Sequence, residues 1–351
     1  MDEGVAALRK AQAKLKRYRA AVLKAAVEGK LTEAWRADHP TTEPASMLLE
    51  RILKERRAQW EADLRAKGKD PAKVKYVEPA KPDVEGLPEL PEGWCWARVE
   101  QVSSSVRYGT SAKTNEDASG IPVLRMGNIQ EGSLDLGNLK YLPENHTEFP
   151  NLLLENGDLL FNRTNSAELV GKSAVYCGNP ILCSYASYLI CVRMVSGCLA
   201  DYLCFYLNSS YGRSWIASVV SQQVGQTNVN GSKLQALTFP LPPFDEQEQI
   251  VSEVEQRLSV VTQLEAQIEA NLKRAEHLRQ SILKEAFAGR LVPQDPNDEP
   301  ASVLLERIRD EREERKKGIV GNGPYAKVSS EPVKIDVEGT RQVGLWERVR
   351  G

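Results

Sequence analysis

Apolar residues recur every three or four positions between residues 245 and 289, which is the period of an α-helix. Pro242 and Pro243 precede this stretch and Gly289 follows it, as is typical of the two ends of a helix. At ~1.5 Å per residue the helix would be about 65 Å long. The residues expected to pair it with another helix are Ile250, Val254, Leu258, Val261, Leu264, Ile268, Leu272, Leu278 and Ile282.

A shorter stripe with the same period begins at Val5 and ends before Gly29. It includes Leu8, Leu15 and Val22, and the positions between them are rich in Lys and Arg. These basic residues are expected on the outer face of the predicted helix. We expect the two helices to pair as an antiparallel coiled coil, because neither stripe can be buried alone.

One sequence unit occurs twice in the chain. VLKAAVEGKL at 22–31 resembles ILKEAFAGRL at 282–291, and EPASMLLERI at 43–52 resembles EPASVLLERI at 299–308. In each copy the pattern predicts a loop and then a shorter helix, which spans 43–67 in the first copy and 299–317 in the second. Weaker copies follow: DVEG at 83–86 recurs at 336–339, and WCWARV at 94–99 resembles GLWERV at 344–349.

Between the two copies the helical period gives way to short apolar runs separated by Gly, Asn, Asp and Pro. This pattern predicts a mixed α/β domain, with its clearest helix at 200–219, and an α+β fold class for the whole chain. The expected organisation is a first helical region at 1–75, a linker at 76–91, the middle domain at 92–244, a second helical region at 245–317 and a C-terminal tail at 318–351.

The composition of the chain limits the classes of protein to which it can belong. The chain has 351 residues, of which 41% are hydrophobic and 27% charged, with a net charge of −2. This is the balance of a globular protein, and no apolar run is long enough to span a membrane. The six cysteines form no C-x-x-C pair and the three histidines lie far apart. We therefore expect no metal site, and reduced, mostly buried thiols in a cytoplasmic protein.

Several enzyme motifs are incomplete. ELVGKS at 168–173 ends like a phosphate-binding loop, but Ser166 stands where that loop requires glycine. GNGPYA at 321–326 resembles a dinucleotide fingerprint, but it contains Pro324 and follows no predicted strand. There is no N-P-P-[FYW] stretch of an amino-methyltransferase. The sequence therefore predicts no catalytic residue and no cofactor bound by this chain.

Four polar loops of the middle domain, at 105–115, 125–130, 161–173 and 221–233, offer a different chemistry. Arg, Asn and Gln can pair with base edges, whereas Ser, Thr and Lys can hold phosphates. The alternative is that these residues only form turns, and composition does not choose between the two. The domain has ten basic and twelve acidic residues, so its charge predicts weak DNA binding on its own.

The candidate residues fall into two groups. Those proposed for base edges are Arg125, Asn128, Asn162, Arg163, Asn165, Gln226 and Asn228. Those proposed for phosphate contacts or stacking are Tyr108, Lys113, Thr164, Ser166, Lys172, Thr227 and Lys233.

The arrangement resembles the specificity subunit of type I restriction-modification systems. The resemblance rests on LPEGWCW (90–96), GDLLFNRTN (157–165), QTNVNGSKLQALTFPLPPFDEQEQIV (226–251) and the two repeats, and it spans nearly the whole chain. It implies that the middle domain is a target-recognition domain reading one half of a split DNA site. It also implies that the helices set the distance between the halves.

The resemblance further implies partners. These are double-stranded DNA, adenine methyltransferase (modification) subunits, and a restriction subunit that is an ATP-dependent endonuclease. S-adenosylmethionine and ATP with Mg²⁺ would then be bound by those subunits. A complete subunit of this kind carries two recognition domains, whereas one lies between the repeats here, as in a half-subunit or a truncated form. We therefore expect self-association or pairing with another half-subunit.

A rival hypothesis comes from a different class of protein. In it the chain is a coiled-coil scaffold that does not bind DNA, and the middle domain binds a protein partner. The two hypotheses differ in whether Arg163 and Asn165 contribute to sequence-selective DNA binding.

Overall fold

The structure is a computed structural model that describes residues 2–166, 168–223, 226–293 and 297–319. The chain forms two compact units, residues 1–277 and 278–351. The weak copies at 336–339 and 344–349, the motif at 321–326 and the tail from 320 onward lie outside the described residues.

The first helical region contains three α-helices. These are α1 (Asp2–Val27), α2 (Glu33–Asp38) and α3 (Ala45–Ala66). α1 ends where the sequence predicts, and Gly29 beyond it has a φ of 69°, a conformation that glycine adopts without strain. The predicted linker contains no helix or strand; the short 3₁₀ helix η1 (Pro71–Lys73) precedes it.

The middle domain is closed by its first and last strands. β1 (Cys95–Arg98) pairs antiparallel with β14 (Thr238–Leu241), which brings the two ends of the domain together. Between them lie α4 (Val99–Val102), β2 (Ser103–Tyr108), β3 (Ile121–Leu124), η2 (Met126–Asn128), β4 (Ile129–Gln130), β5 (Ser133–Leu134), β6 (Lys140–Leu142), β7 (Asp158–Asn162), β8 (Thr164–Asn165), β9 (Ser173–Tyr176), β10 (Ser184–Tyr185), β11 (Leu189–Met194), α5 (Ala200–Asn208), α6 (Ser210–Val219), β12 (Ser221–Gln223), β13 (Gln226–Asn228) and α7 (Gly231–Gln235).

An antiparallel sheet of order β2-β11-β7-β9 forms the centre of the domain. Both faces of its two middle strands, β11 and β7, are buried, so these strands are apolar at consecutive positions instead of alternating with polar residues. In β7, Leu159 and Phe161 point into one core and Leu160 into the other. Leu159, Leu160 and Phe161 are consecutive apolar residues for this reason.

The predicted helix at 200–219 is wrong in one respect, because the chain breaks it at Ser209. α5 ends at Asn208 and α6 begins at Ser210. Ser209 has an extended backbone, and its hydroxyl donates to Tyr206 O (2.7 Å) and accepts from Gly212 N (3.5 Å). The serine therefore caps the second helix, a competition with helix continuation that the apolar pattern does not reveal.

The first helical region shares a core with the middle domain. Leu23 and Ala26 of α1, and Leu48 and Ile52 of α3, belong to the same buried cluster as the inner face of the sheet. A Cβ atom on Gly197 would lie 2.9 Å from Leu48 Cδ1, so the close approach of α3 requires glycine there. The boundaries predicted at 75 and 92 therefore do not separate independent cores.

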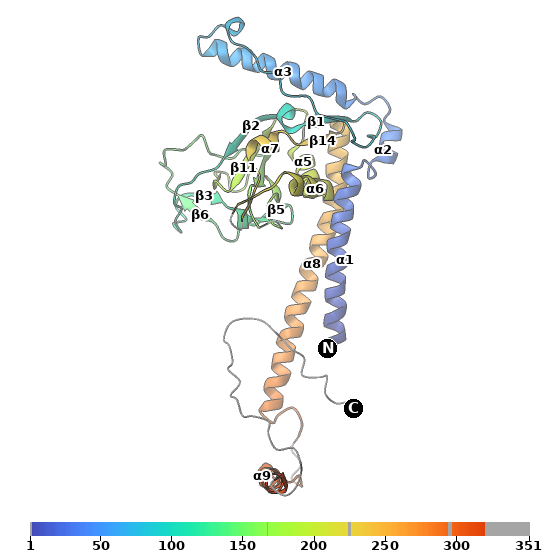
Figure 1. The fold of residues 1–351 in the computed structure, drawn as a ribbon, viewed down its shortest axis with the longest axis vertical. Helices are drawn as coiled ribbons and strands as arrows, with labels where there is room; N and C mark the ends of the chain where they lie inside the picture. Colours follow the sequence, from blue (N-terminus) through green and yellow to red (C-terminus); the bar gives the residue numbers. More distant parts are fainter. Residues whose placement is uncertain (1, 167, 224–225, 294–296, 320–351) are drawn as a thin grey trace. The chain divides into compact units, whose positions relative to one another are not determined.

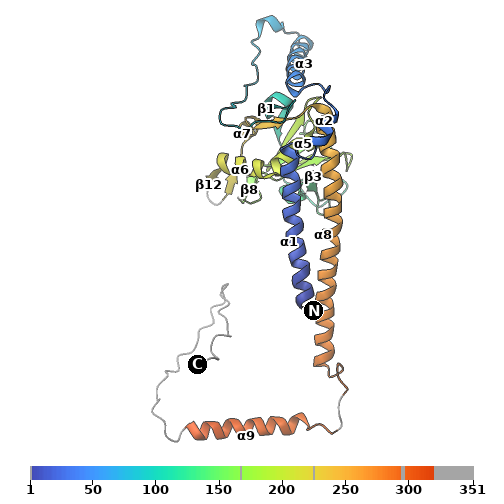
Figure 2. The same cartoon turned by 90° about the vertical axis from the view of Figure 1, so that its right-hand side faces the viewer.

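The long helix is one element, α8 (Phe244–Phe287), of 44 residues. Figures 1 and 2 show α1 and α8 side by side and running in opposite directions. Arg19 Nη2 of α1 donates to Glu265 Oε2 at 2.9 Å and to Thr262 Oγ1 at 3.4 Å. The predicted antiparallel pairing of two long helices is confirmed.

The apolar stripe of α8 does not form one continuous pairing surface. Ile250 and Val254 are buried in the core of the domain, and Val261 is also buried. Leu258, Ile268 and Leu272 are half-buried. Leu264, Leu278 and Ile282 are exposed, which corrects their assignment as pairing residues within one chain.

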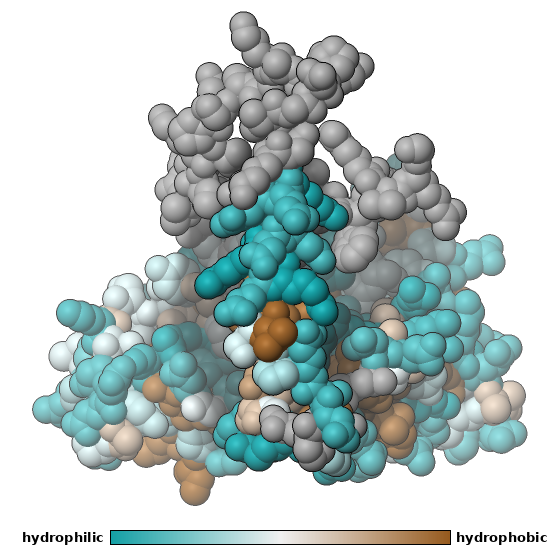
Figure 3. All heavy atoms as spheres, turned by 90° about the horizontal axis from the view of Figure 1, so that it is seen from below, coloured by the Kyte–Doolittle hydropathy of each residue, from teal (hydrophilic) through white to brown (hydrophobic). Residues whose placement is uncertain are grey.

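The two repeats differ sharply in burial. Leu23, Val27, Leu48 and Ile52 of the first repeat are at most 7% exposed. Their counterparts in the second are Leu283 (48%), Phe287 (90%), Leu304 (40%) and Ile308 (38%), the last two in α9 (Ala301–Ile319). Figure 3 shows hydrophobic residues at the surface as separate groups among hydrophilic ones. The same apolar positions are thus covered in one copy and uncovered in the other.

The cysteines are free, as predicted, and only Cys177 is exposed. Burial raises the pKa of Cys95 to about 11 and that of Cys183 to about 12, which keeps these thiols protonated at neutral pH. Within the described part of the chain, no helix is long and apolar enough to cross a membrane, and no His, Cys, Asp and Glu side chains cluster as metal ligands.

A buried ion pair joins two strands of the central sheet. Asp158 at the start of β7 is 1% exposed and accepts from Arg193 Nε at 2.8 Å and Nη2 at 2.7 Å. We expect Asp158→Asn to lower the free energy of unfolding by about 2–3 kcal/mol, because it removes the buried one of the two carboxylates that pair with a largely buried guanidinium. Urea unfolding followed by circular dichroism measures this change.

Glu155→Gln is the matched control. Its carboxylate pairs with the same arginine but is 67% exposed, so its loss should cost less than about 1 kcal/mol. Equal losses for the two variants would contradict the assignment of the stabilisation to the buried pair.

Candidate nucleic-acid interface

Two polar loops that lie far apart in sequence form one small sheet. Its strand order is β12-β13-β8, with Thr227 opposite Asn165 and Asn228 opposite Thr164. The backbone N–H of Val229 also donates to Arg163 O at 2.9 Å. We call this sheet, with Tyr108 and Arg163 beside it, the polar ribbon.

Arg163 and Tyr108 are stacked at the edge of the ribbon. The Arg163 guanidinium carbon lies 4.7 Å from the centre of the Tyr108 ring, a cation–π geometry. The Tyr108 hydroxyl accepts from Gly231 N at 2.7 Å, and Arg163 Nη1 donates to Ser187 O at 3.3 Å. These contacts hold a planar guanidinium in place and connect three of the four predicted loops.

The ribbon offers the groups that recognise nucleotides. Tyr108 is 43% exposed, and Arg163, Thr164 and Asn228 are half-buried. A fixed guanidinium can donate two hydrogen bonds to guanine, an amide can pair with adenine, and an exposed aromatic ring can stack on a base. The arrangement therefore suits recognition of base edges.

Tyr188 is a candidate that the sequence analysis did not select. Its ring is 48% exposed, and its carbonyl oxygen accepts from Arg163 N at 3.0 Å. Tyr188 precedes β11 in the segment SYASY, and apolar runs surround it. An aromatic residue in such a run resembles a core residue, so only the structure places it next to Arg163.

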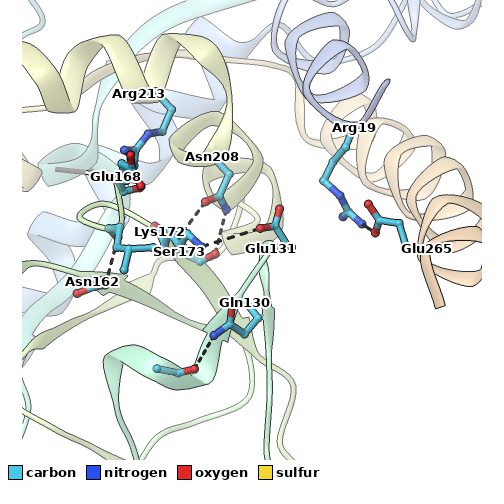
Figure 4. Close-up of polar contacts among 12 residues, drawn as sticks. Arg19, Gln130, Glu131, Asn162, Glu168, Lys172, Ser173, Asn208, Arg213 and Glu265 are labelled. Atoms are coloured by element: carbon cyan, nitrogen blue, oxygen red, sulfur yellow. Dashed lines mark hydrogen bonds and ion pairs between the residues drawn. The ribbon is translucent and has the colours of Figure 1, made fainter. Parts of the chain in front are cut away.

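Two of the candidate asparagines are buried and hold loops together. Asn128 is 3% exposed; its Oδ1 accepts from Arg125 N and its Nδ2 donates to Asp135 O. Asn162 is 1% exposed, and its Nδ2 donates to Leu169 O at 3.1 Å, as Figure 4 shows. The assignment of these two residues to base edges is therefore corrected, because their amides face the backbone of their own loops.

Other candidates are engaged within the protein. Thr227 is only 5% exposed, which argues against a phosphate contact. Lys233 Nζ donates to Val219 O at the end of α6 (2.6 Å), and Arg125 Nη2 donates to Asn138 O (3.0 Å). Lys172 lies 3.9 Å from Glu131 and lines a cavity of about 190 Å³ beside α1 (Figure 4). Thr227 is thus a buried member of the polar ribbon, and Lys233, Arg125 and Lys172 lie outside the ribbon.

The segment resembling a phosphate-binding loop is a packed turn. Gly171 has a φ of 83°, and a Cβ atom there would lie 2.0 Å from Ile216 Cδ1 of α6. Arg213 donates to Val170 O at 2.5 Å and to Glu168 O at 3.1 Å, and burial lowers the pKa of this arginine. The close packing explains the glycine without any phosphate.

Exposed candidates remain as predictions. Lys113 and Ser166 are exposed, and Thr164 is half-buried. Asn165 and Gln226 contribute backbone pairing to β8 and β13.

The fold defines a class of protein in which two paired helices carry an α+β domain. The first and last strands of that domain pair with each other. Residues 91–274 match the profile of the type I restriction modification DNA specificity domain. The match covers more than half of the chain, and the protein belongs to this family.

Curated relatives agree with this assignment. The chain is 29% identical over 314 residues to the type I restriction enzyme EcoKI specificity subunit of Escherichia coli (strain K12), covering 85% of this chain and 56% of that protein. It is 29% identical over 230 residues to the StySPI specificity subunit of Salmonella potsdam, covering 63% and 50%. The chain thus spans about half the length of these relatives.

Among solved structures, the HsdS subunit from Thermoanaerobacter tengcongensis is similar, with 23% identity and a TM-score of 0.38 over 70% of this chain and 56% of that chain.

We expect Asn162→Ala to lower the free energy of unfolding by about 1–2 kcal/mol, because it removes a buried hydrogen bond to Leu169 O. Glu168→Gln, six residues further on at an exposed position, should change stability by less than about 0.5 kcal/mol. Denaturant unfolding of both variants measures the difference. An Asn162→Ala variant with unchanged stability would show that the amide of Asn162 does not hold the loop.

Proposed function

We propose that this chain is the DNA sequence-recognition subunit of a type I restriction-modification complex and reads one half of a bipartite target. The observation that carries the proposal is the polar ribbon, in which two distant loops pair and Arg163 is held against Tyr108. Family membership supports the same conclusion.

The charge of the domain suits a subunit that binds DNA as part of an assembly. Affinity for duplex DNA comes mainly from basic residues that neutralise phosphates. The middle domain has ten basic and twelve acidic residues, so it cannot supply much of this electrostatic contribution to the affinity for DNA. We infer that base contacts select the site and that the partner subunits supply most of the phosphate contacts.

The length of α8 suits a spacer between two recognition domains. Its 44 residues correspond to about 66 Å, close to two turns of DNA at ~34 Å each. Such a helix can place two domains on the same side of the duplex. The number of residues in α8 then encodes the separation of the half-sites.

The chemistry belongs to other chains in this proposal. Adenine methyltransferase (modification) subunits would bind S-adenosylmethionine, and a restriction subunit would bind ATP and Mg²⁺. This chain would position both in the cytoplasm without taking part in bond making or breaking.

The uncovered apolar positions of the second repeat supply a surface for assembly. In the first repeat the same positions are buried against the recognition domain of this chain. We propose that the second repeat docks a second recognition domain, brought by another copy of this chain or by another half-subunit. Burying Phe287 and Leu283, which are 90% and 48% exposed, would contribute about 2–4 kcal/mol together.

The alternative function is a scaffold whose middle domain binds a protein. The paired helices favour it equally, but it gives no role to the stacked Arg163. A measurement of DNA selectivity separates the two functions.

We expect Arg163→Ala together with Asn165→Ala to abolish sequence-selective methylation by the complex assembled with modification subunits. Each lost base contact costs about 1–3 kcal/mol of discrimination, or roughly 5-fold to 150-fold per contact. Methylation of a target duplex and a scrambled duplex at one fixed salt concentration measures this ratio. Arg125→Ala is the matched control, because its guanidinium binds Asn138 within its own loop. Selectivity that survives the double change would show that Arg163 and Asn165 do not read the bases.

We expect Phe287→Asp to weaken self-association, because it places a charge in the proposed docking surface. Sedimentation velocity of the complex with modification subunits compares this variant with the wild type. Phe287 is 90% exposed in the single chain, so the variant should fold normally. A wild-type chain that stays a single copy in that complex, with no second half-subunit bound, would contradict the docking proposal.

A further inference from the structure

The first turn of α8 contains a carboxylate that no solvent reaches. Glu246 is 0% exposed, although it lies only two residues after Phe244, where the helix begins. Burial of an ionised carboxylate is costly unless partners surround it.

Three side chains from two other segments bind this carboxylate. Thr32 Oγ1 donates to Oε1 at 2.7 Å, and Trp94 Nε1 donates to Oε2 at 2.8 Å. Arg36 of α2 donates from Nη2 to Oε1 at 2.8 Å and from Nε to Oε1 at 3.1 Å. We call Glu246, Thr32, Arg36 and Trp94 the Glu246 clamp.

The clamp also reaches the end of α1. Arg36 Nη2 donates to Gly29 O at 2.7 Å, and its guanidinium carbon lies 5.7 Å from the centre of the Trp94 ring. A Cβ atom on Gly29 would lie 2.6 Å from Arg36 Nη2, so glycine is needed for this approach as well as for its φ of 69°. One carboxylate therefore connects α1, α2, the first residues of the domain and α8.

The neighbouring residue fixes α8 from another side. Gln247 is also 0% exposed; its Oε1 accepts from Leu199 N at 2.9 Å and its Nε2 donates to Pro242 O at 3.0 Å. Leu199 precedes α5 in the domain. Because Glu246 and Gln247 are bound by different segments, both the tilt and the rotation of the start of α8 are determined.

A small change of angle at this point matters because the helix is long. A tilt of about 5° at Glu246 moves a point about 45 Å further along α8 by about 4 Å, which exceeds the ~3.4 Å rise between neighbouring base pairs. The direction of α8 relative to the domain must therefore be held within a few degrees if the protein is to distinguish DNA spacers that differ in length by one base pair.

We propose that Glu246 is a positioning residue that fixes the direction of α8 relative to the recognition domain and so sets the spacing between half-sites. This inference rests on the proposed function for its consequence in DNA, whereas the clamp itself is a property of the single chain.

The second repeat cannot form this clamp. The first repeat has eleven residues, 32–42, between GKL and EPAS, whereas the second has seven, 292–298, between GRL and EPAS. The shorter segment, VPQDPND, contains no Arg or Lys, and Val292 stands where the first repeat has Thr32. The clamp is therefore made within one chain, and the second repeat of another copy does not replace it.

The first experiment measures the direction of α8 without DNA. Nitroxides are placed at Ser214→Cys on α6 and Gln263→Cys on α8, both exposed, in the full chain with Cys177→Ser. Double electron–electron resonance should give a narrow distance distribution for the otherwise wild-type chain and a broader one for Glu246→Gln, which loses the charge that binds Arg36. Glu248→Gln, an exposed change of the same kind two residues away, should leave the distribution narrow.

The second experiment measures spacing in DNA. The complex with modification subunits methylates duplexes that carry the same two half-sites separated by the normal spacer or by one base pair more or fewer. Glu246→Gln should lose the preference for the normal spacer while binding of a duplex with one half-site is unchanged. A merely destabilised protein would lose activity on all these duplexes alike.

The outcomes are distinct. A narrow distribution and an intact spacer preference in a folded Glu246→Gln chain overturn the inference. If the Glu246→Gln variant does not fold, the resonance experiment is repeated with Arg36→Lys, which keeps the positive charge but loses the planar guanidinium and should also broaden the distance distribution. A distribution as narrow as that of the wild type in Arg36→Lys would also overturn the inference. A wild-type complex without sequence-selective methylation would refute the proposed function, whereas the resonance experiment would still test the clamp.

Discussion

The first turns of α8 are buried in the core of the recognition domain, and this burial fixes how the helix and the domain are joined. Ile250 and Val254 belong to the same cluster as the inner face of the sheet and the helices of the first repeat. Glu246 and Gln247 are buried beside them and bind three other segments. A helix that starts inside a core cannot change direction without disturbing that core.

This arrangement separates two tasks that the protein has to combine. Recognition needs side chains with exposed polar groups, and these lie on short strands and turns such as β8 and β13. Spacing needs a stiff element, which a single helix of 44 residues provides. The domain is closed by pairing of β1 with β14, so the chain leaves it through Pro242 and Pro243 directly into α8.

The duplicated unit shows how one sequence serves in two environments. Leu48 and Ile52 pack against Gly197 in the first copy, whereas Leu304 and Ile308 of the second are exposed. Equal apolar patterns therefore do not imply equal burial within one chain. The four-residue difference between the loops adds a chemical difference, because only the first copy carries Thr32 and Arg36.

The long helices, their ends at Gly29 and Gly289, the repeat and the α+β class could all be predicted from the sequence, because the helical period and glycine stops are local signals. It also brought Tyr108 and Arg163 into the candidate set. Three other features became visible only in the folded chain: Asn128 and Asn162 face their own loops, Ser209 breaks a helix, and Tyr188 lies beside Arg163. The physical reason is that an asparagine has the same chemistry in a turn and at a base edge, so its role depends on which neighbours the fold brings within hydrogen-bond distance.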